Sequence, residues 1–178
     1  MGLTPLEGLP GATRSGSIDP SLVFHYTSGA SSLVRSSTKE LHISVAEEIL
    51  NKQAGWKSMV GTTDFGKIVN GMHEGDQKMK LIFDLFVDRT VGYIGNYFVK
   101  LGGNVDALTF SGGIGEKSED LRKAVIDKVV CLGFQLDNAA GSANVNGAVM
   151  RLGPKVLLVK TNEEVRAMVY FMSRLIEG

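Results

Sequence analysis

The sequence has few cysteines, no long apolar run and no excess of basic residues, and each of these features excludes a class of protein. Its single cysteine, Cys131, excludes an internal disulfide, so a reducing, cytoplasmic location is expected. No apolar run approaches the ~20 residues that a membrane-spanning helix needs, and the first residues lack the pattern of a secretory signal. Nineteen basic residues balance nineteen acidic ones without a basic block, which argues against nucleic acid as a partner.

The rest of the composition is that of an ordinary globular protein. Of the 178 residues, 43% are hydrophobic and 21% are charged, which is enough for one domain with a sizeable core. The 22 glycines indicate tight turns and close backbone approaches. The first 20 residues have neither helical nor strand periodicity and are predicted to form an ordered loop, and residues 27–40 are predicted to be a serine-rich surface insertion.

One long helix stands out, over residues 77–101. Apolar side chains recur there at helical spacing, and Gly102-Gly103 follows as a stop signal. Gly92 and Gly95 lie inside this helix, where each glycine costs about 1 kcal/mol relative to alanine. We therefore expect another element to pack closely against them.

Two strand–turn–helix units occupy the second half of the chain. In the first, a buried strand at 105–110 leads through a turn at 111–115 into a helix with one apolar face. In the second, a strand at 155–159 leads through a turn at 160–162 into a helix at 163–176, and residues 137–149 form a loop between the units. Strands that alternate with helices predict an α/β domain. Cys131 is expected in its core.

The glycine-rich segment Gly112-Gly113-Ile114-Gly115 is a candidate ligand site. Glycines let a ligand approach the backbone, and N–H groups at a helix start can donate to it. A plain tight turn explains the same residues, and the pattern alone leaves both interpretations open. Acidic residues follow directly, at Glu116, Glu119 and Asp120, and would repel a phosphate chain. A ribose or an adenine edge is therefore the better guest.

Two further residues are candidates for phosphate and metal chemistry. Arg14 lies among small residues, where its fork of donors could bind phosphate or carboxylate; a solvated surface arginine is the alternative. In the second strand–helix turn, Thr161 and Glu164 fit a capping box, which leaves Glu163 free to project toward a ligand or a metal-bound water.

Together, these segments resemble the acetate kinase family, in its fungal form, in both order and spacing. The resemblance covers nearly the whole chain, and its first motif is long and specific. The matching segments are residues 1–10, 13–16 and 18–20, Leu50-Asn51-Lys52 with Gly55, residues 110–116, and residues 161–164. The resemblance implies a ribonuclease-H-like α/β domain of the actin-like and sugar kinase superfamily, with a mixed sheet flanked by helices.

The same resemblance implies a reaction, ATP + acetate ⇌ ADP + acetyl phosphate, with Mg²⁺. It implies that Arg14 stabilises the transferring phosphoryl group, that Glu163 helps to hold Mg²⁺, and that a homodimer forms through this domain. The residues that would line the nucleotide pocket are Asp64, Phe65, Gly66, Gly113, Ile114, Gly115, Glu116 and Lys117. The family usually has Asp-Phe-Arg where this chain has Asp64-Phe65-Gly66.

The resemblance also concerns how much of an enzyme is present. The resemblance implies that residues 1–178 are a C-terminal nucleotide-binding domain, and that the family's N-terminal domain with its phosphate loop is not among them. We therefore expect a truncated or partial form with little activity alone. The alternatives are a propionate or butyrate kinase of the same family and a non-catalytic nucleotide-binding or dimerisation module. A reading frame upstream of Met1 that encodes the missing loop would favour the enzyme.

Overall fold

A computed structural model describes residues 6–23, 44–137 and 149–161. The expected insertion at 27–40 and the expected helix at 163–176 lie outside these ranges. The chain divides into two compact units, Met1–Ile94 and Gly95–Gly178. Among the described residues, no helix is both long enough and apolar enough to cross a membrane.

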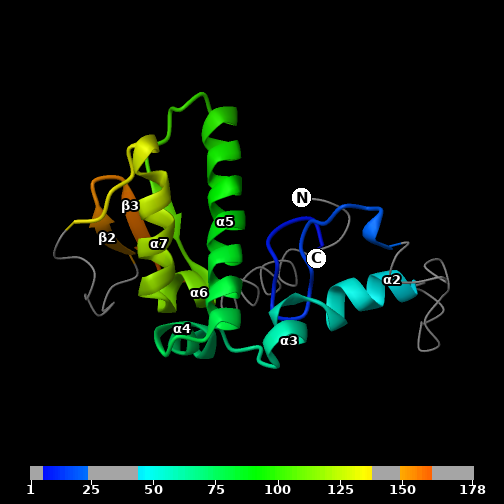
Figure 1. Cartoon of the computed structure of the whole chain (residues 1–178). Helices are drawn as coiled ribbons and strands as arrows, with labels where there is room; N and C mark the ends of the chain where they lie inside the picture. Colours follow the sequence, from blue (N-terminus) through cyan, green and yellow to red (C-terminus); the bar gives the residue numbers. More distant parts are fainter. Residues whose placement is uncertain (1–5, 24–43, 138–148, 162–178) are drawn as a thin grey trace, which may run out of the picture. The chain divides into compact units, whose positions relative to one another are not determined.

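The first unit consists of an N-terminal loop and a series of helices (Figure 1). The helices are α2 (Val45–Glu48), the π-helix η1 (Ile49–Gln53), α3 (Gly55–Val60), α4 (Phe65–His73) and the first part of α5 (Gln77–Lys100). Their core is a cluster of aromatic rings. The ring centroids of Trp56 and Phe65 lie 5.7 Å apart, and Phe86 lies 5.8 Å from Trp56 and 5.2 Å from Phe65.

Helix α5 confirms the long helix predicted from the sequence, and it runs unbroken to Lys100. Its end is closed by the amide of Gly103, which donates to the carbonyl of Phe98 at 2.9 Å, with Gly102 in the left-handed conformation at φ +66°. The expected close packing on Gly92 and Gly95 is wrong for the part of the chain that is described. A Cβ atom added at either glycine would meet nothing within 4 Å.

The second unit contains a small mixed sheet of β1 (Leu108–Phe110), β2 (Val149–Gly153) and β3 (Val156–Val159). The strand order is β1-β3-β2, with β1 parallel and β2 antiparallel to β3. Strands β1 and β3 confirm the two expected strands in shortened form. Strand β2 was not predicted, because the sequence analysis ended a loop at Val149 and assigned no structure between Val149 and the next strand.

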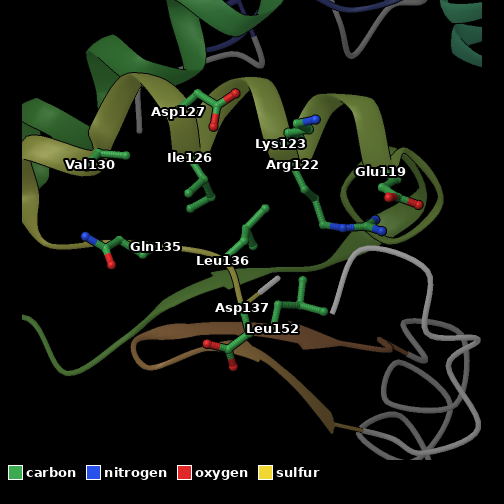
Figure 2. Close-up of a pocket in the computed structure, with 10 residues that line it drawn as sticks. All are labelled: Glu119, Arg122, Lys123, Ile126, Asp127, Val130, Gln135, Leu136, Asp137 and Leu152. Atoms are coloured by element: carbon green, nitrogen blue, oxygen red, sulfur yellow. The ribbon is translucent and has the colours of Figure 1, made fainter. Parts of the chain in front are cut away.

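Helices of the second unit pack against one face of this sheet. They are α6 (Gly112–Lys117) and α7 (Glu119–Val129), followed by a 3-10 turn, η2 (Val130–Leu132). Ile126 of α7 and Leu152 of β2 both point into the space between these two elements (Figure 2), and both are buried. The remaining buried apolar residues of this core are Phe110, Leu121, Val125, Val129, Phe134, Val156 and Leu158.

Two expectations for this region are corrected. The segment predicted as a turn at 111–115 is mostly helical, because α6 begins at Gly112. Cys131 is exposed and does not belong to the core. It lies in η2, two positions after the buried Val129 of α7, and residues two apart on a helix do not share a face.

Candidate functional site

The loop that carries Arg14 is attached to the first turn of α3. The carbonyls of Gly11 and Ala12 accept hydrogen bonds from the amides of Trp56 (3.3 Å) and Lys57 (2.9 Å). Amides in the first turn of a helix have no partner within the helix. The loop backbone therefore caps α3, and this capping fixes the path of the chain just before Arg14.

The same loop is also hydrogen-bonded to η1 and to Ala54 after it, through the residue before Arg14 and the residue after it. The carbonyl of Thr13 accepts from the amide of Ala54 at 2.9 Å, and the amide of Ser15 donates to the carbonyl of Leu50 at 2.9 Å. Both residues that flank Arg14 are thus hydrogen-bonded to the same junction between two helices. The ordered loop expected from the sequence is confirmed for the residues from Leu6 onward.

Two glycines allow the close approach of loop and helix. Gly55 has φ +70°, and a Cβ atom there would lie 2.1 Å from the carbonyl oxygen of Gly11. Gly16 has φ +73°, and its Cβ would lie 2.6 Å from the backbone nitrogen of Pro10. Any other residue at either position would force the backbone of the loop to move.

The side chain of Arg14 is exposed at this fixed point of the loop. Within the described ranges, its guanidinium has neither a hydrogen bond nor an ion pair. A cation that is held at its base and free at its tip can bind phosphate or carboxylate through two parallel hydrogen bonds. This arrangement suits the role that the sequence suggested for Arg14.

The second predicted group of the first unit, Asp64, Phe65 and Gly66, starts helix α4. The carboxylate of Asp64 accepts from the amide of Gly66 at 2.8 Å, which is an N-terminal cap. Phe65 is buried in the aromatic cluster, whereas Asp64 and Gly66 are exposed. The contribution of these three residues to a nucleotide pocket stays a prediction.

In the second unit, the glycine-rich segment forms an open surface at the start of α6. Gly112 has φ +73°, and a Cβ atom added at Gly113 would meet nothing within 4 Å. Gly113 is exposed, and Ile114 and Gly115 are half-buried. The backbone at Gly112 and Gly113 is therefore open to a ligand, and the contribution of this segment to a nucleotide pocket stays a prediction.

Glu116 connects this segment to the end of β3. Its Oε1 atom accepts from the amide of Gly112 at 2.9 Å and from the amide and hydroxyl of Thr161 at 2.9 and 3.0 Å. The backbone hydrogen bond from Thr161 holds the pKa of Glu116 below its ordinary value, so this side chain is a carboxylate at neutral pH. The predicted metal ligand Glu163 follows Thr161 by two positions and lies outside the described residues.

Arg122 is a residue of this region that the sequence analysis missed. It is only 9% exposed, and its Nη1 donates to the carbonyls of Gly115 (2.8 Å) and Glu116 (2.9 Å) at the end of α6. Burial lowers the pKa of this guanidinium, although arginine stays charged in proteins. One signal was present in the sequence, because Arg122 precedes Ile126 by one helical turn and therefore lies on the buried face of α7.

A cavity of about 540 Å³ lies between α7 and β2 (Figure 2). Its walls carry charges of both signs, including Glu119, Lys123 and Asp127. None of the residues predicted as functional from the sequence lines this cavity. Among the described residues there is also no group of three His, Cys, Asp or Glu side chains that could hold a metal ion.

Comparisons with known proteins agree with one another. The Acetokinase family matches residues 1–169. A probable acetate kinase of Emericella nidulans is 65% identical over 137 residues, which cover 77% of this chain and 32% of that protein. Thus the chain spans about a third of the length of this curated relative.

Two solved structures are similar in fold. The acetate kinase of Porphyromonas gingivalis has a TM-score of 0.77 at 27% identity, and the match covers 98% of this chain and 43% of that one. A propionate kinase from Francisella tularensis has a TM-score of 0.73 at 33% identity, with 93% and 40% covered. Both likenesses extend over nearly all of this chain and less than half of the solved one.

Proposed function

The chain belongs to the acetokinase family, and on that premise we propose that it carries the nucleotide-binding and phosphoryl-binding part of an acetate kinase. The reaction is reversible phosphoryl transfer between ATP and acetate, which gives ADP and acetyl phosphate. The observation that carries the proposal is the exposed guanidinium of Arg14, which has no partner among the described residues, on a loop whose backbone is hydrogen-bonded on both sides of it. The activity of the whole protein is part of the proposal, because the chain spans 32% of the Emericella nidulans relative.

Arg14 is proposed to stabilise the phosphoryl group during transfer. Phosphoryl transfer depends on positioning and on the neutralisation of charge that spreads over the oxygens of the moving group. A guanidinium fixed at its base loses little conformational freedom when it binds two of these oxygens. Glu163 is proposed as one ligand of Mg²⁺, an ion that would neutralise phosphate charge and whose remaining ligands are waters and substrate oxygens.

The nucleoside end of ATP or ADP is proposed to bind at Gly113–Lys117 and at Asp64–Gly66. The open backbone at Gly113 offers room for a base or a ribose. The carboxylates of Glu116, Glu119 and Asp120 make the same place unfavourable for phosphates. We further propose that the mixed sheet of the second unit belongs to a ribonuclease-H-like domain.

A propionate kinase is the second candidate, and the Francisella tularensis structure supports it at 33% identity. Both candidates share the phosphoryl and nucleotide chemistry and differ in the length of the acyl chain. Rates with acetate, propionate and butyrate, measured for the full enzyme, decide between them. A preference for propionate or butyrate would replace acetate in the proposal.

Self-association into a homodimer is also proposed. Large apolar side chains are exposed along α5, among them Leu81 (57%), Tyr97 (56%) and Val99 (75%). Exposed apolar surface of this kind favours association with another surface. Sedimentation equilibrium should give twice the monomer mass, and a single monomeric species at high protein concentration would contradict this part.

Titration calorimetry with ADP and Mg²⁺ tests the nucleotide assignment. Gly113→Leu fills the open surface at α6, and Gly92→Leu is a matched control, because a Cβ at Gly92 also meets nothing within 4 Å. The first substitution should weaken ADP binding by about tenfold or more, equivalent to ~1.4 kcal/mol, and the second should not. Neither variant should have a melting temperature below that of the wild type, and Gly92→Leu should raise it because glycine inside a helix is unfavourable. Unchanged affinity in Gly113→Leu would remove this surface from the proposed pocket.

A further inference from the structure

The hydroxyl of Thr13, the residue just before Arg14, makes a long-range hydrogen bond to the backbone of η1. Thr13 Oγ1 donates to the carbonyl of Asn51 at 3.0 Å, across 38 positions of sequence. The carbonyl of Thr13 accepts from Ala54 at the same junction. Thr13 is therefore held through both its backbone and its side chain at the position directly before Arg14.

The acceptor of this hydrogen bond belongs to an uncommon element. Asn51 lies in the π-helix η1, and π-helices are rare and occur often at functional sites. Carbonyls near the end of a helix lack a donor within the helix. In η1 two successive carbonyls, of Leu50 and Asn51, accept from the two residues that flank Arg14. The π-helix η1 thus accepts hydrogen bonds from the side chain of Thr13, before the proposed phosphoryl-binding residue, and from the backbone amide of Ser15, after it.

Gly11 restricts the stem of Arg14 from another direction. A Cβ atom at Gly11 would lie 3.0 Å from Cγ and 3.1 Å from Nε of Arg14, so the arginine side chain occupies the space that a larger residue would need. The amide of Gly11 also donates to the carbonyl of Arg14 at 3.0 Å. Gly11 has no left-handed backbone, so alanine there would displace the arginine stem without straining its own φ angle.

We propose that Thr13 and Gly11 are positioning residues for Arg14. Thr13 fixes the backbone through the end of η1, and Gly11 provides the surface on which the arginine stem lies. Their effect on phosphoryl transfer rests on the proposed function of Arg14. Their effect on the position of Arg14 does not, and the two can be measured separately.

The test uses the ¹⁵N-labelled chain and the Nε–H signal of Arg14, assigned by its loss in Arg14→Gln. Heteronuclear NOE values report how firmly the side chain is held, and titration with pyrophosphate reports its affinity for a phosphate ligand. Thr13→Val removes the hydroxyl with little change of shape, and Thr13→Ser keeps it. Thr90→Val is the matched control, because Thr90 Oγ1 donates to the carbonyl of Phe86 at 2.8 Å within α5.

We expect Thr13→Val to lower the NOE of Arg14 Nε and to raise the dissociation constant for pyrophosphate about fivefold, as loss of one ordinary hydrogen bond would. Thr13→Ser and Thr90→Val should match the wild type in both measurements. Gly11→Ala should reproduce the effect of Thr13→Val without removing a hydrogen bond. If Thr13→Val does not fold, Gly11→Ala alone tests whether these residues position Arg14.

Wild-type values of the NOE in both Thr13→Val and Gly11→Ala would overturn the inference. A second outcome, concerning the response of Arg14 to pyrophosphate, would contradict the proposed function and leave the positioning role intact. If pyrophosphate leaves the Arg14 signal of the wild type unchanged while Thr13→Val still lowers the NOE, the positioning role stands and the phosphoryl-binding role of Arg14 is wrong.

Discussion

Substitution of Gly55 by alanine tests the attachment of the Arg14 loop to helix α3. Gly55 has φ +70°, and the added Cβ would lie 2.1 Å from the carbonyl oxygen of Gly11. That contact is with backbone, so no side-chain rotation can relieve it. The loop must move away, and its hydrogen bonds to the amides of Trp56 and Lys57 are lost with it.

The expected loss of stability has two parts. A left-handed backbone costs an alanine about 1–2 kcal/mol. The two hydrogen bonds that the displaced loop gives up contribute about 1 kcal/mol each. The free energy of unfolding should therefore fall by about 3–4 kcal/mol, near the upper end of what single substitutions cause. Gly61→Ala is the control: Gly61 has φ +75°, but its Cβ would meet nothing within 4 Å, so only the first part applies.

Urea denaturation followed by far-UV circular dichroism measures both variants. The chain has one tryptophan, Trp56, which adjoins Gly55, so its fluorescence reports the junction directly. Gly55→Ala should be less stable than Gly61→Ala by about 2 kcal/mol, the part due to the lost hydrogen bonds. Equal losses in the two variants would refute the close approach of loop and helix described here.

Three further predictions concern activity, pH dependence and reactivity. The purified chain should form no acetyl hydroxamate from ATP, acetate and hydroxylamine above background, because catalytic groups that act as a unit fail together; robust turnover would contradict this. The pKa of Glu116 is lower in the folded state than its ordinary value of 4.5. The hydrogen bonds of the carboxylate therefore stabilise the fold fully above pH 4.5, and this stabilisation is lost as the pH falls through the lower pKa of the folded state. The melting temperature should therefore fall more steeply below about pH 4.5 in the wild type than in Glu116→Gln, and parallel curves would show that the interaction with Thr161 contributes nothing. Cys131, being exposed, should react with a thiol reagent without denaturant; protection until unfolding would place it back in the core.

Local patterns predicted the elements that local interactions determine. The long helix was found because its apolar side chains repeat with helical spacing and its stop signal, Gly102-Gly103, is adjacent in sequence. Strand β2 was missed because its pairing with β3 places Val149 opposite Val159, a register that neither segment reveals alone. The exposure of Cys131 agrees with helical spacing from the buried Val125 and Val129, and the prediction was wrong because it relied on the apolar residues adjacent to Cys131 in sequence.

The candidate site shows the same division. Residue types and spacing identified Arg14 and the glycine-rich segment as candidates. The helical conformation of that segment depends on Arg122, seven positions after Gly115, which binds its last carbonyls. The fixed position of the Arg14 loop depends on a hydrogen bond between Thr13 and Asn51. Such contacts join distant positions, so they become visible only in the structure.

The most direct test of the proposed nucleotide site is a titration of the ¹⁵N-labelled chain with ADP and Mg²⁺, followed amide by amide. We predict that ADP and adenosine both shift the amide signals of Gly113–Lys117 and Asp64–Gly66, and that pyrophosphate alone shifts the Nε–H signal of Arg14. The proposed site is wrong if ADP leaves the signals of Gly113–Lys117, Asp64–Gly66 and Arg14 unchanged, or if the shifted signals are confined to residues that line the cavity between α7 and β2.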